Sequence, residues 1–590
     1  MQAQVRPRQD QERLWVDIGT HVFFLAILVL AIVSCRERLF ADSGYYLFHT
    51  LNTGHFWIEH GRFVLALSQV APLIGASLGL NLDQVLVLYS AGHVLFCYLV
   101  YLLARFRYRA TYAGPYLVLI QTLGIASGWF APMFELYYGA ALLILIDILL
   151  RRQIHHWPDW ALLITVTSLT LSSHPMAFVL VGMVLLFHWL DVRQINKKNV
   201  SIAVLMLIIA AIKALFASGY EQARMEQVWK VIDENPLGPA YWLDVAGLLL
   251  QWYVPVLLMI VAVLVRLIRQ GKSMHWMLVL ISTFGLIFLA VLQNYGTEHT
   301  RYQEQAYFPL SVMATYVCVR YLFLHLSMTG RRMAWLGLAL LVMWKIWIIE
   351  REWGAFRLRT DTIERLVAVA QERPGTKFVI DEYNVSLPTG PGPNWSYGIE
   401  SLLLSAADGH QKTVTVCLDS DMAARNNADR ITPDEFLLRK WDILPIDDLN
   451  ARWFQLDRST YAHLNAQRVV IDTIDHLLGN AELRIDGPKA CLPRDRICYL
   501  PVTVRNHSTE TLYASQANQL LLSYHWMHGD TIVTWDGLRT PLESDVIDIY
   551  AQTMAIRTPA RAGRYTLVLD LVAEHRGWLG ADCRMDVNIQ

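Results

Sequence analysis

The feature that most constrains the fold of this chain is a series of long apolar runs in its first 350 residues. A helix needs about 20 predominantly apolar residues to cross a bilayer. Runs of this kind lie near 15–34, 84–104, 112–130, 134–150, 158–173, 175–190, 200–217, 241–265, 275–292, 305–326 and 333–349. Only 17% of the 590 residues are charged and the formal net charge is -1. The sequence therefore predicts a polytopic α-helical membrane protein in contact with a lipid bilayer, and no nucleic-acid partner.

The stretch 62–80 is apolar too, but Arg62, Gln69 and Pro72 make it a poorer candidate for a complete crossing. Lys and Arg accumulate in short cytoplasmic loops. The basic clusters of the first 350 residues are Arg6/Arg8/Arg13, 105–109, Arg151/Arg152, Arg193/Lys197/Lys198, Arg266/Arg269/Lys272 and Arg331/Arg332. All of them fall on the cytoplasmic side if 62–80 lies along the outer interface. We therefore expect about eleven spans, a cytoplasmic N terminus and an extracytoplasmic chain after Glu350.

The rest of the chain has the composition of soluble domains, which predicts three parts: 1–350, 351–480 and 481–590. In the second part, a helix over 351–373 is followed by a strand at 376–380, a helix at 396–407 and a strand at 412–418, typical of a small α/β unit. From 481, short alternating runs such as ICYLPVTVRN and GRYTLVLDLVAE predict an antiparallel β-sandwich. The sequence from 481 onward resembles the β-sandwich domains found beside bacterial polysaccharide enzymes. This resemblance implies that the protein acts on or near carbohydrates.

Two features of this region leave alternatives open. No C-x-x-C pairing occurs in the chain, so neither a zinc ribbon nor a thioredoxin motif is supported. Cys491 and Cys498 either form a disulfide or stay reduced. Trp526, Trp535 and Trp578 either stack on sugars or belong to the core of the sandwich.

Ionisable groups at the outer ends of spans are the candidates for chemistry, because a charge near a membrane is costly to bury. No motif for nucleotide hydrolysis, dinucleotide binding, a zincin or a serine hydrolase occurs in a suitable context. Asp42 follows the first span by a few residues, in FADSGYYLF. Its carboxylate is suited to act as a general base or to hold a divalent cation. The alternative is that Asp42 or Ser43 caps the helix that follows.

The order of these features resembles the C-type glycosyltransferase superfamily, in particular the protein O-mannosyltransferases and the lipid A aminoarabinose transferases. The shared order is a first span, an acid followed by YY, an interfacial segment, a span ending LVYLLARF, a basic turn, a further span, an acid in the next outer loop and a span ending in RR. The resemblance covers residues 15–320 and implies transfer of a sugar from a polyprenyl-phosphate carrier to an extracytoplasmic glycan, lipid or protein at the bacterial inner membrane.

The resemblance assigns the catalytic roles to two acids. Asp42 matches the catalytic acid of the first outer loop, although Ser43 stands where the family has a second acid. Glu135, in APMFELYYG, matches the acid of the second outer loop and would contact the acceptor or a metal. Its alternative is a capping or snorkelling role. Whether a divalent cation assists is left open by the residues.

The donor phosphate is assigned to basic groups. Arg301, in HTRYQEQAYFPL, matches the family's Arg-Tyr ahead of a Pro-containing span, and Arg grips phosphate in a bidentate fork. His174, in LSSHPMAF, would supply a cation or a hydrogen-bond donor, and His60 or Arg62 would take the part of a basic residue near the phosphate. Interface anchoring for Arg301 and a turn for His174 are the alternatives.

These assignments predict an inverting transfer in which Asp42 acts on the acceptor hydroxyl and the basic groups neutralise the departing phosphate. An oligosaccharide ligase is a variant within the same class. A non-catalytic component of surface-polysaccharide assembly or export would keep the spans and the sandwich but tolerate loss of Asp42, Glu135 and Arg301. A secondary transporter would need sites at the bilayer midplane and repeat symmetry, and the sequence shows neither.

Overall fold

A computed structural model describes most of the chain, which divides into two compact units, residues 1–351 and 352–590. The described residues are 5–153, 156–216, 218–219, 221–223, 226, 228–229, 239–294, 300–326, 328–380, 395–407, 412–426, 431–440, 442–464, 480–485, 491–507, 512, 514, 520–529, 531–546, 548–573 and 577–590.

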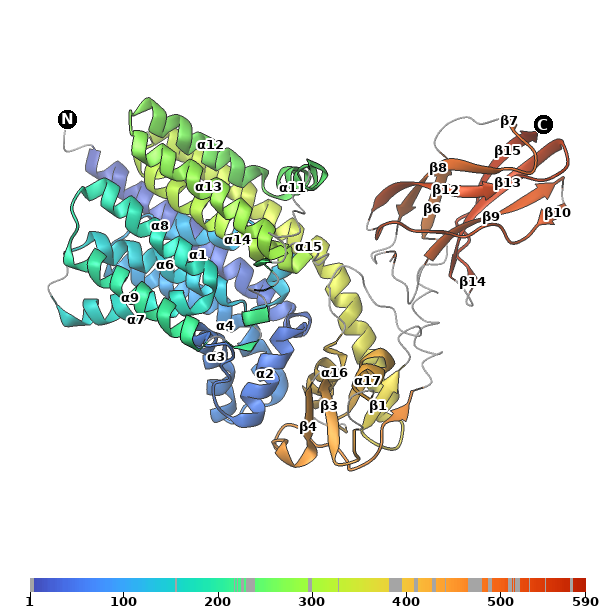
Figure 1. Cartoon of the computed structure of the whole chain (residues 1–590), viewed down its shortest axis with the longest axis horizontal. Helices are drawn as coiled ribbons and strands as arrows, with labels where there is room; N and C mark the ends of the chain where they lie inside the picture. The colour runs from blue at the N-terminus through green and yellow to red at the C-terminus, as the bar shows by residue number, and fades with distance from the viewer. Residues whose placement is uncertain are drawn as a thin grey trace. The chain divides into compact units, whose positions relative to one another are not determined.

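The first unit is built of helices (Figure 1). The longer ones are α1 (Val5–Val33), α4 (Leu82–Leu102), α6 (Glu135–Arg151), α7 (Trp157–Ser173), α8 (Pro175–Val192), α9 (Lys197–Leu215), α12 (Val254–Arg269), α13 (Ser273–Asn294), α14 (Thr300–Val317) and α15 (Met328–Gln371). The shorter ones are α2 (Asp42–Thr53), α3 (Ala66–Ser77), α5 (Ala113–Thr122), α11 (Pro239–Trp252) and the single turns η1 (Glu37–Leu39), η2 (Phe63–Leu65) and η4 (Ser127–Phe130).

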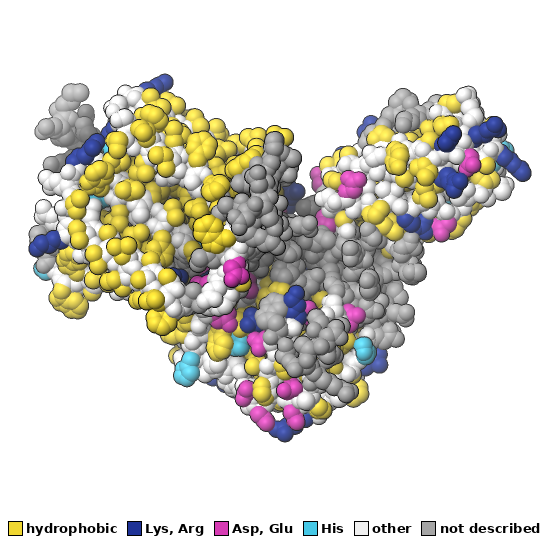
Figure 2. All heavy atoms as spheres, viewed as in Figure 1, with side chains coloured by type: hydrophobic (Ala, Val, Ile, Leu, Met, Phe, Trp, Pro, Cys, Tyr) yellow, Lys and Arg dark blue, Asp and Glu magenta, His cyan; other side chains and the backbone are white. Residues whose placement is uncertain are grey.

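The described part of the chain contains 6 helices long and apolar enough to cross a membrane, or 7 if α11 and α12 count as one broken span. Large apolar side chains such as Leu25, Leu207, Leu258 and Phe284 are exposed on these helices. Hydrophobic side chains cover much of the visible face of the first unit, and Lys and Arg lie at its left margin (Figure 2). Because water does not tolerate an apolar surface of this extent, the chain is a multi-pass membrane protein. The predicted number of eleven spans stays a prediction.

Two predicted spans are interrupted. The run 112–130 is helical only to Thr122; the chain then turns at Gly124, whose φ of 70° suits glycine, and stays buried but irregular up to α6. The run 241–265 breaks between Trp252 and Val254 with an 88° bend. Pro255, in the first turn of α12, explains this break because proline has no N–H to continue a preceding helix. Stretch 62–80 forms the short apolar helix Phe63–Ser77.

The start of the second unit follows the predicted α/β pattern. Strands β1 (Lys377–Ile380), β2 (Thr415–Leu418) and β5 (Ala462–His463) form a parallel sheet in the order β2-β1-β5, with α16 (Tyr397–Ala407) and α17 (Asp419–Asn426) beside it. A separate hairpin joins β3 (Glu435–Arg439) and β4 (Asp442–Pro445). Buried Arg359 on α15 pairs with Glu400 on α16 at 2.9 Å, which fixes one helix against the other.

The C-terminal region is β-rich, with two sheets that share one hydrophobic core. One sheet has the order β10-β9-β13-β15-β7, and the other β12-β8-β6. Their strands are β6 (Ala481–Ile485), β7 (Cys491–Leu492), β8 (Ile497–Asn506), β9 (Leu520–His528), β10 (Thr531–Thr534), β11 (Thr540–Pro541), β12 (Ile549–Arg557), β13 (Gly563–Ala573), β14 (Gly577–Trp578) and β15 (Cys583–Ile589). Alternating apolar residues of β8 and β9, such as Val502, Leu522 and Tyr524, point into the core. Cys491 and Cys498 are both free thiols.

Candidate functional site

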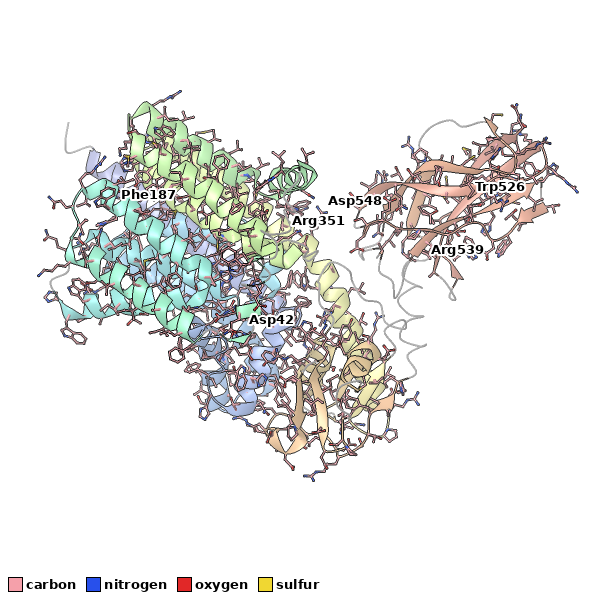
Figure 3. The ribbon with its side chains drawn as sticks, viewed as in Figure 1. Asp42, Phe187, Arg351, Trp526, Arg539 and Asp548 are labelled. Carbon is pink, nitrogen blue, oxygen red and sulfur yellow. The ribbon has the colours of Figure 1, made fainter. Side chains whose placement is uncertain are left out.

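Asp42 is the first residue of α2 and does not cap it. The capping position is Ala41, whose φ of 50° and ψ of -115° are unusual for a residue with a Cβ, and no side chain caps the helix. The helix-cap alternative for Asp42 is therefore wrong. The carboxylate lies in the first helical turn, where the peptide dipoles favour a negative charge. Strained backbone persists where the surrounding structure over-determines it, and here that strain directly precedes Asp42. Figure 3 labels this residue.

Glu59 is the acceptor at the centre of an aromatic cluster beside Asp42. The hydroxyl of Tyr45 donates to its Oε1 at 2.7 Å and that of Tyr46 to its Oε2 at 3.3 Å. The indole N–H of Trp57 donates to Oε1 at 3.3 Å. Burial, followed by the carboxylates of Glu135, Glu59 and Asp42, raises the pKa of Tyr46 above its ordinary value. Tyr46 is therefore a neutral hydrogen-bond donor, within electrostatic range of all three acids.

Arg62 and Glu135 form an ion pair between the interfacial segment and α6. Nη1 of Arg62 lies 2.6 Å from Oε1 of Glu135, and the two side chains are 18% and 6% exposed. Glu135 begins α6 directly after the irregular segment that follows α5. The capping alternative for Glu135 receives no support from this geometry, because its carboxylate pairs with a cation that comes 73 residues earlier in the chain.

Two histidines, His60 and His174, lie near the Arg62–Glu135 ion pair. His60 Nδ1 shares a hydrogen bond of 2.9 Å with the hydroxyl of Ser218, and burial together with Arg62 lowers the pKa of His60. Nδ1 of His174 accepts from the backbone N–H of Met176 at 3.2 Å, at the junction of α7 and α8. Burial, then the charges of Arg62 and Lys213, lowers the pKa of His174, so it offers a donor and not a cation.

Lys213, near the end of α9, was assigned no chemistry from the sequence. Its ammonium is within electrostatic range of Glu221, Arg62 and Glu135. Its Nζ is buried and makes no hydrogen bond within the described part of the chain. The only feature of the sequence that could have identified Lys213 is its position as a lone lysine near the end of an apolar helix. Snorkelling of the side chain to the membrane interface accounts for that position equally well.

The structure thus brings together five of the six predicted site residues: Asp42, His60, Arg62, Glu135 and His174. We call this group, with Glu59 and Lys213, the polar cluster. Arg301 lies at the start of α14, but its side chain is outside the described residues, as are Glu298 and His299. Among the described residues, no group of three or more His, Cys, Asp or Glu is placed to hold a metal ion. The carboxylates and histidines of the polar cluster therefore do not form a ready cation site.

Glu304 binds the segment that precedes Glu135, and the sequence analysis did not identify it as a functional residue. Its buried carboxylate accepts from the backbone N–H groups of Ala126, Ser127 and Gly128 at 2.8–2.9 Å and from the Ser127 hydroxyl at 2.8 Å. These donors belong to the irregular segment that precedes Glu135. Irregular backbone at membrane depth is tolerated where protein groups satisfy it, and Glu304 supplies those acceptors.

Two buried cations hold the same segment. Arg38 is fully buried, donates to the Trp129 carbonyl at 2.9 Å and to the Ser90 carbonyl at 2.7 Å, and lies over the Trp129 ring. Burial lowers the pKa of Arg38 to about 10. Lys345 donates to the carbonyl of Ile125 and is buried. The irregular segment before Glu135 is therefore held by side chains from three distant parts of the chain: Arg38, Glu304 and Lys345.

A second polar network lies at the opposite end of the helices. Phe187, near the end of α8, and Asp42 lie at opposite ends of the first unit in Figure 3. Around Phe187, Arg151 pairs with Asp147 at 2.7 Å and with Asp191 at 2.9 Å. His275 and Arg320 also pair with Asp191. The end of α6, the end of α8 and the start of α13 therefore lie together at this end of the unit.

The fold and the apolar exterior define the chain as a multi-pass membrane protein with a β-rich C-terminal region and a polar cluster at one end of its helices. No protein-family model matches the chain. No curated protein matches its sequence either.

Proposed function

We propose that the protein is a membrane glycosyltransferase that moves a sugar from a polyprenyl-phosphate carrier to an extracytoplasmic glycan, lipid or protein. The observation that carries this proposal is the polar cluster. Residues far apart in the sequence, from the segment after α1 to the end of α9, meet there at one end of an apolar helical unit. Burying so many ionisable groups beside membrane-spanning helices is costly, and such groups serve a site by default.

Asp42 is the base in this proposal. The acceptor oxygen attacks C1 of the sugar, the bond from C1 to the phosphate oxygen breaks, and its electron pair stays on the phosphate. The acceptor proton passes to the Asp42 carboxylate. The carboxylates of Asp42, Glu59 and Glu135 all lie within electrostatic range of Tyr46, as does the Arg62 guanidinium, and a positioned carboxylate can serve as a general base. Attack from the face opposite the phosphate inverts the configuration at C1.

The leaving phosphate is neutralised by Arg62, Lys213 and Arg301, with His174 as a donor. The buried Lys213 ammonium without a described hydrogen bond favours an anionic ligand, since an unpaired buried charge is costly. Arg62 already holds Glu135 at 2.6 Å, so a bound phosphate would share its guanidinium with that carboxylate. A site that excludes water strengthens each of these interactions. No role is assigned to a metal ion, because the described ligands do not converge on one.

The test is transfer of radiolabelled sugar from a polyprenyl-phosphate donor by the Asp42→Asn variant in membranes. Removing a general base slows transfer by about a hundredfold or more, while the amide keeps the shape of the side chain. The matched control is Asp83→Asn, which also removes an Asp from the first turn of a helix but one that pairs with Arg36 outside the cluster. The control is expected to retain transfer.

Insertion of each variant is checked by protease protection of the C-terminal region. If Asp42→Asn inserts normally and transfers sugar at the rate of Asp83→Asn, the catalytic assignment is wrong. A wild-type protein that shows no transfer but is required for surface polysaccharide would instead be a non-catalytic assembly or export component.

A further inference from the structure

The β-rich region carries an aromatic cluster at the margin of one sheet. The ring of His525 on β9 stacks on Trp535 with centroids 4.3 Å apart and an interplanar angle of 22°. The same His525 ring lies 4.2 Å from Trp578 on β14, and the two indoles meet edge to face at 6.1 Å. We call Trp535, Trp578 and His525 the aromatic platform. Only Trp526, of the three tryptophans singled out in the sequence, belongs to the core, where its N–H donates to Arg557.

The platform is exposed on one side and anchored on the other. Trp535 is 57% exposed, whereas His525 beneath it is 8% exposed and bonds through Nδ1 to the Trp535 carbonyl. One face of the Trp535 ring is thus covered by a buried residue, and the other is left for a ligand.

The turn that carries Trp535 is held in one conformation. Gly537 N donates to the Tyr524 carbonyl at 3.0 Å, and a Cβ on Gly537 would lie 2.6 Å from the Tyr524 ring. Only glycine allows this close approach. The ring is therefore positioned before any ligand arrives, and ordering it on binding costs little entropy.

Polar groups border the platform. The Arg539 guanidinium lies 5.2 Å from the Trp578 ring and donates to Ser523 Oγ at 2.7 Å and to Asp536 Oδ1 at 2.5 Å. The Asp536 side chain is 62% exposed. Figure 3 labels Arg539 at the margin of the β-rich region. A charged donor thus lies beside the half-buried Trp578 ring, and a charged acceptor, Asp536, directly follows the exposed Trp535 in the chain.

We infer that the aromatic platform is a glycan-binding site. A pyranose has an apolar face of C–H groups, which stacks on an indole, and a rim of hydroxyls, which need donors and acceptors beside that ring. The platform supplies both, with Trp535 and Trp578 for the face of the sugar and Asp536 and Arg539 for the hydroxyls. The bent arrangement of the two indoles favours a chain of at least two sugar units. This site belongs to the second unit and requires no catalysis by the first.

The test is equilibrium binding of defined neutral oligosaccharides to the full chain in detergent. Maltohexaose, cellohexaose and chitohexaose are titrated by isothermal calorimetry, without any lipid-linked donor. Trp535→Ala is expected to weaken the binding of the preferred hexaose about tenfold or more, and Trp535→Phe to restore part of it because a stacking face returns. The matched control is Tyr499→Ala, which removes an exposed aromatic side chain from β8, in the other sheet.

Asp42→Asn is expected to bind the oligosaccharides like wild type, so failure of the platform and failure of the transferase proposal are distinguishable. The inference is overturned if no hexaose binds saturably at millimolar concentration, or if Trp535→Ala and Tyr499→Ala bind alike. It is also overturned if Trp535→Ala abolishes self-association of the chain while no oligosaccharide binds, because the patch would then be a contact between copies.

Discussion

Glu304 provides the sharpest test of how the segment before Glu135 is held. The perturbation is Glu304→Gln, which keeps the size of the side chain and removes its charge and one acceptor. In the structure, Oε1 accepts from the N–H and hydroxyl of Ser127, and Oε2 from the N–H groups of Ala126 and Gly128. A glutamine oxygen can serve only one of these pairs, and its NH₂ group then faces the other.

The expected loss follows from these four bonds. The best arrangement keeps the bonds to Ala126 and Gly128 and turns the Ser127 hydroxyl to accept from the glutamine NH₂, which leaves the Ser127 N–H unpaired. A hydrogen bond to a charged group contributes about 1.5–3 kcal/mol, and a neutral one about 0.5–1.5 kcal/mol. One lost bond, worth about 1.5–3 kcal/mol, and three bonds weakened by about 1–1.5 kcal/mol each lower the free energy of unfolding by about 4.5–7.5 kcal/mol. Domains are stable by only about 5–15 kcal/mol, so the effect is large.

The assay is urea unfolding of the purified protein in detergent, followed by helical circular dichroism. Glu350→Gln is the control, because this exposed carboxylate lies near the end of the first unit. It is expected to change the free energy of unfolding by less than about 0.5 kcal/mol. A Glu304→Gln variant that unfolds within about 1 kcal/mol of this control would refute the inference that Glu304 fixes the segment.

Two further predictions concern the packing of α6 against α7 and the titration of His60. A Cβ on Gly139 would lie 2.6 Å from the Ser173 hydroxyl, so Gly139→Ala should destabilise the protein by about 1–3 kcal/mol in the same assay, and adding Ser173→Ala should recover much of that loss; no recovery would contradict the clash. The pKa of His60 is lower in the folded chain than in the unfolded one, so the unfolded chain binds more protons as pH falls below about 6.5, and stability should fall there. His60→Gln should reduce this fall in unfolding measurements between pH 7 and 5, and an unchanged pH profile would refute it.

The sequence predicts secondary structure well where one periodic signal acts alone. ICYLPVTVRN coincides with β8, in which buried and more exposed residues alternate, and GRYTLVLDLVAE contains β13, which pairs with a strand on each side and is buried over most of its length. The segments 376–380, 396–407 and 412–418 contain β1, α16 and β2 as expected. Hydropathy does not predict the structure of 123–134. The apolar composition of this segment indicates that it is buried, but not whether its backbone forms helical hydrogen bonds.

The contacts of the polar cluster depend on long-range packing and were harder to predict from the sequence. Asp42, Arg62 and Glu135 were each singled out by position relative to a span, but the pairing of Arg62 with Glu135 was not. Glu304 bonds to residues up to 178 positions away, and no local pattern marks such a partner. The bend at Pro255 is different, because proline inside an apolar run is a readable local signal.

The two polar ends of the first unit differ in a way that bears on function. At one end, Asp147 and Asp191 face Arg151 and Arg320, and Asp191 alone lies within 4 Å of Arg151, His275 and Arg320. Such a network is satisfied by the protein and fastens helices together. In the polar cluster, the Nζ of Lys213 is buried and has no hydrogen bond among the described residues. A buried ammonium without a hydrogen bond carries a desolvation cost that an anionic ligand can offset. The polar cluster, and not the opposite end, is therefore where a substrate is expected to bind.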